Sequence, residues 1–194
     1  MEKIPTLFKR DPEDMKRVLP EVNPGCEWVL AGEGVATRKY DGTCMMLDGA
    51  GRWWARREVK PGKQPPANYK PISTDEVTGK TVGWEPVEQS PFVKFYDEAR
   101  FNPESMFEGS GTYELCGPKI NGNPEGYSSH TLIPHAEAAR VELDADDLTF
   151  DLLAAIMGAA EPHFEGIVWH HPDGRMAKLK VRDFPREPAL RREG

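Results

Sequence analysis

Apolar and polar residues alternate in several short stretches of this chain, which is the pattern of half-buried β-strands. Residues 35–39 show this alternation, and a short apolar run follows at residues 44–47. An Asp-Gly pair at residues 41–42 predicts a turn between the two runs. We therefore expect a β-hairpin here, with Lys39 projecting from it beside the turn.

Further strands are predicted at residues 52–59, 83–88 and 111–117. The first of these follows the turn sequence DGAG, so it is expected to be the returning strand of a hairpin. A helical piece is expected around residues 92–101. Residues 60–82 contain four prolines and little apolar periodicity, so they predict a long excursion of the kind that is functional or disordered.

Two clearer patterns follow in the second half of the chain. A helix is predicted at residues 148–158, with Asp146 or Asp147 as its N-cap and Gly158 at its end. Its apolar stripe consists of Leu148, Leu152, Leu153, Ile156 and Met157. Residues 164–170 and 175–181 predict a hairpin around a His-Pro-Asp-Gly turn. Strands joined by hairpins, with few helices, indicate an α+β fold of mostly antiparallel sheets.

The length of 194 residues fits one domain with ragged ends. We expect an N-terminal arm at residues 1–25 that packs on a domain of residues 26–186, followed by a C-terminal tail at residues 187–194. The basic residues Lys178 and Lys180 lie close to the end of the sequence. A macromolecular substrate is therefore expected to be gripped by this one domain, by the excursion at residues 60–82 or by a partner.

The cysteines and the hydropathy pattern predict the cellular compartment of the protein. Cys26, Cys44 and Cys116 share no CxxC spacing and leave an odd thiol over. This argues against a disulfide framework or a zinc ribbon and favours a reducing compartment. No apolar run has the length of a signal peptide or a membrane span. We therefore expect a soluble cytoplasmic protein with no membrane partner.

The formal net charge of -7 argues against a nonspecific nucleic-acid coat, because such binding depends on lysines and arginines that neutralise phosphates. The charge is uneven along the chain, however. Residues 52–63 and 174–186 are basic, whereas residues 141–151 are acidic. Phosphate ligands are therefore expected in the two basic segments.

Four charged side chains on the predicted strands are candidates for nucleotide chemistry. Lys178 and Lys180 are two residues apart, so both leave the same face of the last strand. Glu165 heads the partner strand, and Glu114 lies in an apolar strand, where an isolated charge is unfavourable. Most of these residues also fit a simpler role when taken alone. Lys178 and Lys180 fit a solvated strand face, and Glu165 fits a strand-end carboxylate. Lys39, earlier in the chain, fits a surface charge beside a turn.

In chain order, these pieces resemble the motifs of covalent nucleotidyltransferases, the superfamily of polynucleotide ligases and capping enzymes. The order is KxDG at Lys39, Arg56 on the next strand, the YEL-G strand of Glu114, EGIVW at Glu165, and KLK at residues 178–180. More closely, the chain resembles the small ATP-dependent RNA ligases of the vertebrate type. That resemblance covers most of residues 35–182 through KYDGTC, WARREVKPGKQ, GWEPVE, ELCGPKINGNPEGY, HTLIPHA and EGIVWHHPDGRMAK.

The resemblance implies a nucleotidyltransferase domain of ATP-grasp-like fold and a role for each matching residue. Lys39 would attack the α-phosphate of ATP, giving a lysyl-adenylate and pyrophosphate. The implied ATP-binding residues are Thr37 at the adenine pocket, Asp41 with a less defined role, Arg56 at the ribose or phosphate, Glu114 at the ribose, Glu165 at the nucleotide's metal ion, and Lys178 and Lys180 at the α-phosphate. An attacking lysine must lose its proton, and free lysine has a pKa near ~10.4. Nearby cations would favour that loss.

The implied cofactors are ATP and Mg²⁺ (or Mn²⁺), and the implied partner is RNA with 5′-phosphate and 3′-hydroxyl ends, which the enzyme would join. The sequence leaves the oligomeric state open, and a monomer is one possibility. Three alternatives remain: a DNA ligase, a GTP-dependent capping-type enzyme, and a nucleotide- or RNA-binding module without catalysis. The intact set of Lys39, Glu114, Glu165 and Lys178 argues against the last, because a binding module does not need the nucleophile.

Other residues give weaker signals. Arg38 stands where related ligases often carry an acidic residue, which leaves its role open. The five histidines form no HExxH pair and are expected in structural or substrate-edge roles rather than in a metal site. Residues 121–127 predict a turn that is also a candidate substrate loop. Trp53 and Trp54 point to opposite faces of a strand, so one is expected in the core while the other is a candidate for stacking on a base.

Overall fold

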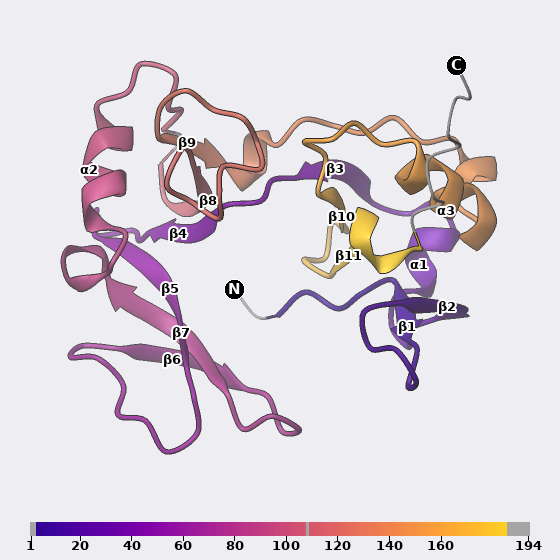
Figure 1. Ribbon diagram of the computed structural model, residues 1–194, viewed down its shortest axis with the longest axis horizontal. Helices are drawn as coiled ribbons and strands as arrows, with labels where there is room; N and C mark the ends of the chain where they lie inside the picture. The colour runs from indigo at the N-terminus through magenta and orange to yellow at the C-terminus, as the bar shows by residue number, and fades with distance from the viewer. Residues whose placement is uncertain (1–2, 108, 186–194) are drawn as a thin grey trace, which may run out of the picture. The chain divides into compact units, whose positions relative to one another are not determined.

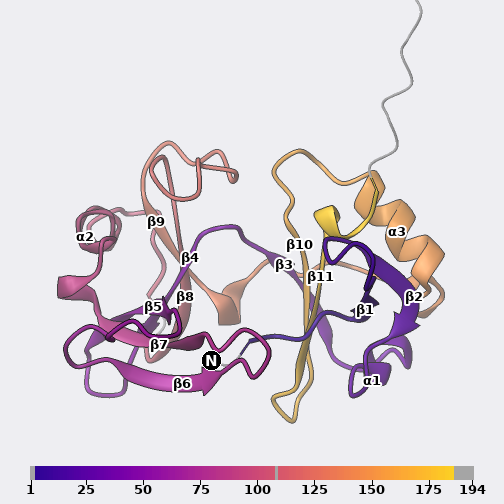
Figure 2. The same ribbon diagram turned by 60° about the horizontal axis from the view of Figure 1, so that its bottom comes forward.

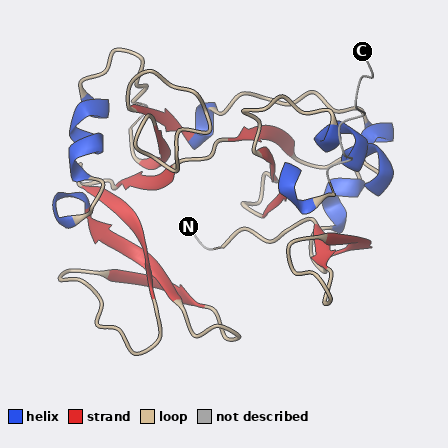
Figure 3. Ribbon diagram, in the orientation of Figure 1, coloured by secondary structure: helices blue, strands red, loops and turns tan. Residues whose placement is uncertain are grey.

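The chain divides into two compact units, with a boundary directly after Lys39. The computed structural model describes residues 3–107 and 109–185. Among the described residues, unit 1 holds Lys3 and residues 40–107 and 109–138, whereas unit 2 holds residues 4–39 and 139–185. Each unit has its own antiparallel sheets and few helices, which confirms the predicted α+β class (Figure 3). No helix among the described residues is long and apolar enough to cross a membrane.

Unit 2 contains a three-stranded antiparallel sheet in the order β11-β10-β3 (Figure 1). Its strands are β3 (Val35–Lys39), β10 (Gly166–His170) and β11 (Met176–Lys180). β10 and β11 form the predicted hairpin, which is thereby confirmed. β3 pairs with the other edge of β10, in a register that sets Gly166 opposite both Lys39 and Lys180.

One face of this sheet is apolar and packs against side chains of β1 (Phe8–Arg10), β2 (Val18–Val22), α1 (Glu27–Leu30), α3 (Phe150–Gly158) and η4 (Val181–Asp183). Unit 2 also contains η3 (Ala145–Asp147), which has no buried residue. The core of unit 2 includes Leu7, Phe8, Trp28, Val29, Leu153, Met157, Ile167, Trp169 and Leu179. Residues 4–25, expected as an arm, thus supply a hairpin and buried side chains to this unit, while residues 187–194, expected as a tail, lie outside the described residues.

The predicted helix at residues 148–158 is confirmed as α3, but its cap is different. Thr149 is the N-cap, and its hydroxyl accepts a hydrogen bond from the backbone N–H of Leu152 at 3.4 Å. Asp146 and Asp147 lie earlier, in η3, so the prediction that one of them caps α3 was wrong. Leu153 is fully buried, whereas Leu152 is 45% exposed. The helix therefore buries a narrower stripe than the apolar pattern suggested.

Unit 1 contains a six-stranded antiparallel sheet in the order β6-β7-β5-β4-β8-β9 (Figure 2). Its strands are β4 (Thr43–Leu47), β5 (Trp53–Val59), β6 (Lys70–Thr74), β7 (Thr81–Pro86), β8 (Gly111–Cys116) and β9 (Thr131–Pro134). The helical pieces are η1 (Val87–Gln89), α2 (Val93–Arg100) and η2 (His135–Glu137). The core includes Met45, Ala55, Tyr96, Ala99, Tyr113, Leu115, Ile120 and Leu132. Predicted strands at residues 52–59, 83–88 and 111–117 and the helix at 92–101 are confirmed, with slightly shifted ends.

Two predictions for the first half of the chain were wrong. β3 and β4 do not form a hairpin, because β3 pairs with β10 while β4 pairs with β5 and β8. Pairing between strands distant in sequence has overridden the local turn signal, and β3 and β4 belong to different units. Residues 60–82 are not a structureless excursion, since they include β6. Pro71 is accommodated there because β6 is an edge strand that pairs only with β7. Proline lacks a backbone N–H, and at an edge this does not interrupt hydrogen bonding to a second neighbouring strand.

Candidate active site

The predicted nucleophile and the predicted metal ligand meet at one end of the unit 2 sheet. Lys39 ends β3, Lys180 ends β11, and Glu165 directly precedes β10. Because Gly166 pairs with both lysines, their side chains leave the same face on either side of a residue without a side chain. Glu165 Oε2 lies 2.5 Å from Lys39 Nζ, and Glu165 Oε1 accepts a hydrogen bond from Lys180 Nζ. One carboxylate is therefore shared by two amines.

This cluster is largely shielded from solvent. The side chains of Lys39, Lys180 and Glu165 are 20%, 13% and 11% exposed. Burial would raise the pKa of Glu165, but the charges and hydrogen bonds of Lys39 and Lys180 outweigh it and hold that pKa below its usual value. The carboxylate is thus ionised at neutral pH. Two amines beside one carboxylate form a cluster that suits an anionic ligand such as a phosphate.

The backbone around the cluster is fixed on both sides. A Cβ on Gly166 would lie 2.1 Å from the carbonyl oxygen of Leu179 and 2.8 Å from Lys180 Cα. Only glycine fits there without moving β11. The backbone N–H of Lys180 donates to Asp183 Oδ2 at 2.8 Å, and this buried carboxylate also pairs with Arg10. The end of β11 is therefore tied in place.

Arg38 has a structural role that the sequence did not reveal. Arg38 pairs in register with the core residue Ile167. Its side chain therefore lies on the core-facing side of the sheet, opposite the side that carries Lys39. Its guanidinium donates to the carbonyl oxygen of His163 at 2.7 Å and lies 5.8 Å from the ring centre of Phe164. Arg38 therefore contacts both residues that directly precede Glu165, His163 and Phe164, and helps to hold them in place.

Thr37 and Lys178 occupy the next row of the same face, on either side of Val168. Thr37 is buried, and its hydroxyl donates to the carbonyl oxygen of Val168 at 3.2 Å and lies 3.1 Å from His170 Nε2. Lys178 is half-buried, and its backbone N–H donates to the carbonyl oxygen of Pro5 at 3.0 Å. The two-residue spacing therefore placed Lys178 and Lys180 on one face as predicted, while contact of Thr37 with adenine stays a prediction.

The other predicted residues belong to unit 1. Glu114 in β8 pairs in register with Cys44 in β4. Their neighbours Met45 and Tyr113 face the core, so strand alternation sends Cys44 and Glu114 to the opposite face. Arg56 follows Ala55, which faces the core and pairs with Met45, so Arg56 lies on the same face as Cys44 and Glu114.

Glu114 is buried but not isolated. Its Oε1 accepts a hydrogen bond from the backbone N–H of Gly42 at 3.1 Å, and its Oε2 lies 2.9 Å from His135 Nε2. His135 Nδ1 in turn lies 2.9 Å from the hydroxyl of Thr112. The charge that the sequence marked as unfavourable is therefore held by a backbone amide and an imidazole. His135 was missed, because its partnership with Glu114 depends on the pairing of β8 with β9.

Residues 121–127 hold the turn that follows Lys39 in the chain. Asn121 Nδ2 donates to Asp41 Oδ1 at 3.0 Å and to the carbonyl oxygen of Gly42 at 2.8 Å. The backbone N–H of Asp41 donates to Glu125 Oε1 at 2.8 Å. A Cβ on Gly42 would lie 2.4 Å from the carbonyl oxygen of Leu115, which explains the glycine. Asp41 therefore positions the turn, and a substrate role for residues 121–127 stays a prediction.

Two further histidines, His130 and His171, make contacts with carboxylates or aromatic rings. His130 is buried, lies 2.6 Å from Glu98 and stacks on Phe95. His171 contacts Glu33 and Asp173 at 2.9 Å and 2.7 Å.

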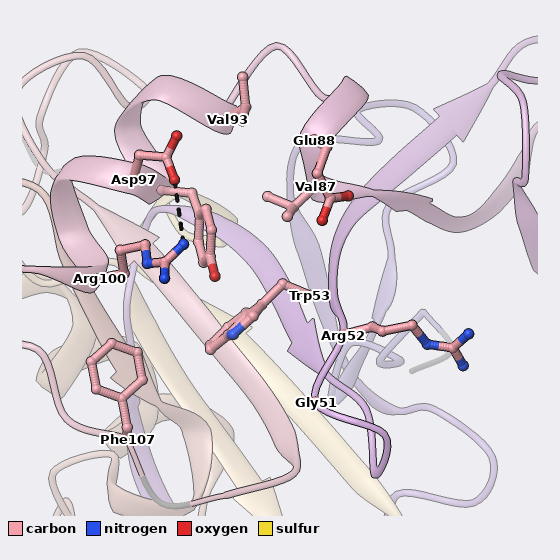
Figure 4. A pocket seen from close by; sticks show the side chains of 10 residues that line it. Gly51, Arg52, Trp53, Val87, Glu88, Val93, Asp97, Arg100 and Phe107 are labelled. Atoms are coloured by element: carbon pink, nitrogen blue, oxygen red, sulfur yellow. Dashed lines mark ion pairs between the residues drawn. The ribbon is translucent and has the colours of Figure 1, made fainter.

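Unit 1 also has a cavity of about 510 Å³ beside α2 and the start of β5 (Figure 4). Half-buried Trp53 faces it, together with Phe107, and Arg100 pairs with Asp97 on its wall at 3.8 Å. Trp54, by contrast, is only 5% exposed. The prediction that the two tryptophans divide between a buried and a more open setting is confirmed, while stacking of a base on Trp53 stays a prediction.

Comparison with known proteins indicates a relationship to one group of enzymes. The chain is 30% identical to RNA ligase 1 of Rattus norvegicus and 28% identical to RNA ligase 1 of Mus musculus, in each case over 75% of this chain and 65% of the relative. A shorter segment, 35% of this chain, is 42% identical to RNA ligase 1 of Pongo abelii and covers 22% of that protein. No protein-family profile matches the chain. The chain thus spans slightly less than two thirds of the rodent proteins and is their distant relative.

Proposed function

We propose that this chain is an ATP-dependent RNA ligase that forms a lysyl-AMP intermediate on Lys39. The observation that supports this most is the shared carboxylate, because Glu165 holds the amines of Lys39 and Lys180 side by side at one end of a sheet. Nucleotidyl transfer to a lysine needs a nucleophilic amine beside a second cation that balances charge on phosphate. The relationship to proteins named RNA ligase 1 favours RNA as the acceptor.

In the first step, Lys39 Nζ forms a bond to the α-phosphorus of ATP, while the bond from that phosphorus to the pyrophosphate oxygen breaks. Pyrophosphate leaves with the electron pair of that bond. The amine must shed a proton, and the ammonium of Lys180 disfavours a second positive charge beside it. Glu165 Oε2, 2.5 Å from Nζ, holds the amine in place, and the proton passes to solvent. Lys180, with Lys178 on the same face, then balances charge on the phosphate oxygens.

Glu165 also suits the divalent ion that nucleotide chemistry requires. Mg²⁺ prefers oxygen ligands and in nucleotide sites is held by one or two carboxylates together with substrate phosphates and water. Glu165 offers such a carboxylate, with its two oxygens already directed at two different amines. When bound, Mg²⁺ or Mn²⁺ would neutralise charge on the phosphates of ATP. The residues therefore fit the ion once the amine of Lys39 or Lys180 moves away from one oxygen of Glu165.

The remaining steps transfer the adenylate. An oxygen of an RNA 5′-phosphate attacks the phosphorus of the lysyl-adenylate, and the amine of Lys39 leaves. A 3′-hydroxyl then attacks the 5′-phosphate, and AMP leaves as the strand is joined. We assign the ribose of ATP to Glu114, the ribose or phosphate to Arg56 and the adenine pocket to Thr37, with Asp41 positioning the turn after Lys39. A reducing, cytoplasmic setting belongs to the proposal, since Cys26, Cys44 and Cys116 are thiols rather than disulfide partners.

The test compares nucleotides and acceptors. Purified protein is incubated with Mg²⁺ and each α-labelled nucleoside triphosphate, and then with nicked or single-stranded RNA or DNA that has 5′-phosphate and 3′-hydroxyl ends. We expect covalent labelling by ATP and sealing of RNA. Labelling by GTP alone would favour a capping-type enzyme, and sealing of DNA alone a DNA ligase. No covalent labelling by any nucleotide would leave a nucleotide- or RNA-binding module and contradict the proposal.

A further inference from the structure

Three side chains with different metal-binding chemistry converge on the face of the unit 1 sheet opposite Met45 and Tyr113. The ligand atoms of Cys44, Glu114 and His135 all lie within 4.8 Å of one another. The sheet explains this convergence, because Cys44 and Glu114 are register partners in β4 and β8. His135 follows β9, whose Ile133 pairs with Glu114. All three belong to one unit, so their arrangement depends on a single sheet.

The donor set indicates which ion would fit. A thiolate, an imidazole and a carboxylate are ligands of Zn²⁺, whereas Mg²⁺ and Ca²⁺ prefer oxygen atoms alone. Three protein ligands leave a fourth tetrahedral position open, as in sites where Zn²⁺ also holds water or another small ligand. This cluster is therefore separate in chemistry from Glu165 and from the ion proposed to accompany ATP.

The side chains are also oriented for coordination before any ion arrives. The backbone N–H of Gly42 holds one oxygen of Glu114, and the other oxygen lies 2.9 Å from His135 Nε2. When a metal binds, the hydroxyl of Thr112, 2.9 Å from His135 Nδ1, can accept a hydrogen bond from the N–H at Nδ1, so that the Nε2 lone pair is directed at the metal in place of its contact with Glu114. Such an outer partner fixes both the tautomer and the direction of a histidine ligand.

We propose that Cys44 Sγ, Glu114 and His135 Nε2 bind Zn²⁺ or a similar borderline divalent ion. Binding releases the thiol proton of Cys44 to solvent, and the ring proton of His135 resides on Nδ1. The metal site stands on this geometry alone. Its consequence rests on the proposed function: an ion on Glu114 would occupy the carboxylate assigned to the ribose, so it would compete with ATP and inhibit adenylation.

Cobalt(II) is a spectroscopic probe for the site, because a thiolate ligand gives a cobalt charge-transfer band in the near ultraviolet. Chelator-treated full-length protein is titrated with Co²⁺ and then with Zn²⁺. We expect the band in the wild type and its loss when Zn²⁺ displaces Co²⁺. Cys44→Ser abolishes the band, and His135→Ala weakens cobalt binding at least about tenfold. Thr112→Val, which leaves all three ligands in place, weakens binding about 10–100-fold.

Two control variants keep the test sharp. Cys26→Ala and His163→Ala remove a thiol and an imidazole from unit 2 and should leave the band unchanged. Circular dichroism of every variant identifies any that fails to fold. A wild-type protein without the band, or a folded Cys44→Ser variant that keeps it, would overturn the site.

The competition is tested separately. Zn²⁺ should inhibit labelling by ATP, a chelator should reverse the inhibition, and the zinc concentration needed should rise at least about tenfold in Cys44→Ser. Cobalt binding with no effect of Zn²⁺ on labelling would overturn the competition. If no labelling by ATP occurs at all, the proposed ligase activity fails, but the cobalt spectrum still decides the metal site.

Discussion

Lys39 Nζ lies 2.5 Å from Glu165 Oε2, although the two residues are 126 positions apart in the sequence. The contact follows from the register of two strands, since Gly166 pairs with Lys39 on one side and with Lys180 on the other. A carboxylate that precedes a central glycine thus reaches the lysine at the end of each neighbouring strand. The predictions below concern this arrangement and the sheet that supports it.

Removing the charge of Lys180 should slow adenylation without unfolding the protein. We expect Lys180→Gln to lower the rate of covalent labelling by ATP about 10²–10³-fold, the usual effect of losing one group that stabilises transition-state charge. Lys9→Gln is the matched control, because Lys9 also pairs with a glutamate, Glu21, at 2.7 Å but on the surface. Quench-flow labelling compares the two variants. Equal rates for Lys180→Gln and Lys9→Gln would contradict a role for Lys180 at the phosphate.

The lowered pKa of Glu165 predicts how stability depends on pH. Its pKa in the folded state is below the ordinary value of 4.5, so the unfolded chain takes up the proton first as pH falls. The stabilisation from Glu165 is therefore complete above about pH 4.5 and is lost as pH falls through the folded pKa. Urea unfolding of wild type and Glu165→Gln over a pH series should give curves that converge on acidification. A gap that is constant or widens towards acid pH would refute this, and Glu13→Gln, an exposed carboxylate, serves as the control.

Gly166 should not tolerate even one added carbon. Alanine would place its Cβ 2.1 Å from the carbonyl oxygen of Leu179 and force β10 and β11 apart. We expect Gly166→Ala to lower the free energy of unfolding by about 1–3 kcal/mol and to reduce ATP labelling strongly. In the same unit, Gly158→Ala meets no atom within 4 Å and should be neutral or slightly stabilising in its helix. Chemical denaturation of both variants checks this, and similar stabilities would count against the proposed clash.

Two adjacent leucines of α3 test the packing of unit 2. Leu153 is fully buried, so Leu153→Ala should cost about 2–5 kcal/mol through lost burial and the cavity it leaves. Leu152 is 45% exposed, so Leu152→Ala should change the free energy of unfolding by less than about 0.5 kcal/mol. Urea unfolding followed by circular dichroism compares them. If the order of the two effects were reversed, the orientation of α3 would be wrong.

The sequence predicted best what is local in the chain. The hairpin of β10 and β11 was predictable because both strands and their turn are contiguous, and the face shared by Lys178 and Lys180 follows from strand alternation alone. The helix α3 was predictable for the same reason. Its cap was not, because Thr149 and several aspartates nearby all have side chains suited to capping.

What depends on distant pairing was beyond the sequence. The Asp41-Gly42 turn predicted a hairpin, yet β3 and β4 take partners from different sheets. Nothing in the periodicity of residues 35–47 distinguishes these outcomes. The convergence of Cys44, Glu114 and His135 likewise requires the registers of β4, β8 and β9, and the support of Glu165 by Arg38 requires the pairing of β3 with β10.

The central claim is that Lys39 becomes adenylated, and peptide mass spectrometry after incubation with ATP and Mg²⁺ tests it most directly. The account predicts one adenylate, on the peptide that contains Lys39 and on its Nζ. The adduct should be absent from Lys39→Met and present in Lys9→Gln. An adenylate on another lysine, or a Lys39→Met variant that is still labelled, would contradict the account.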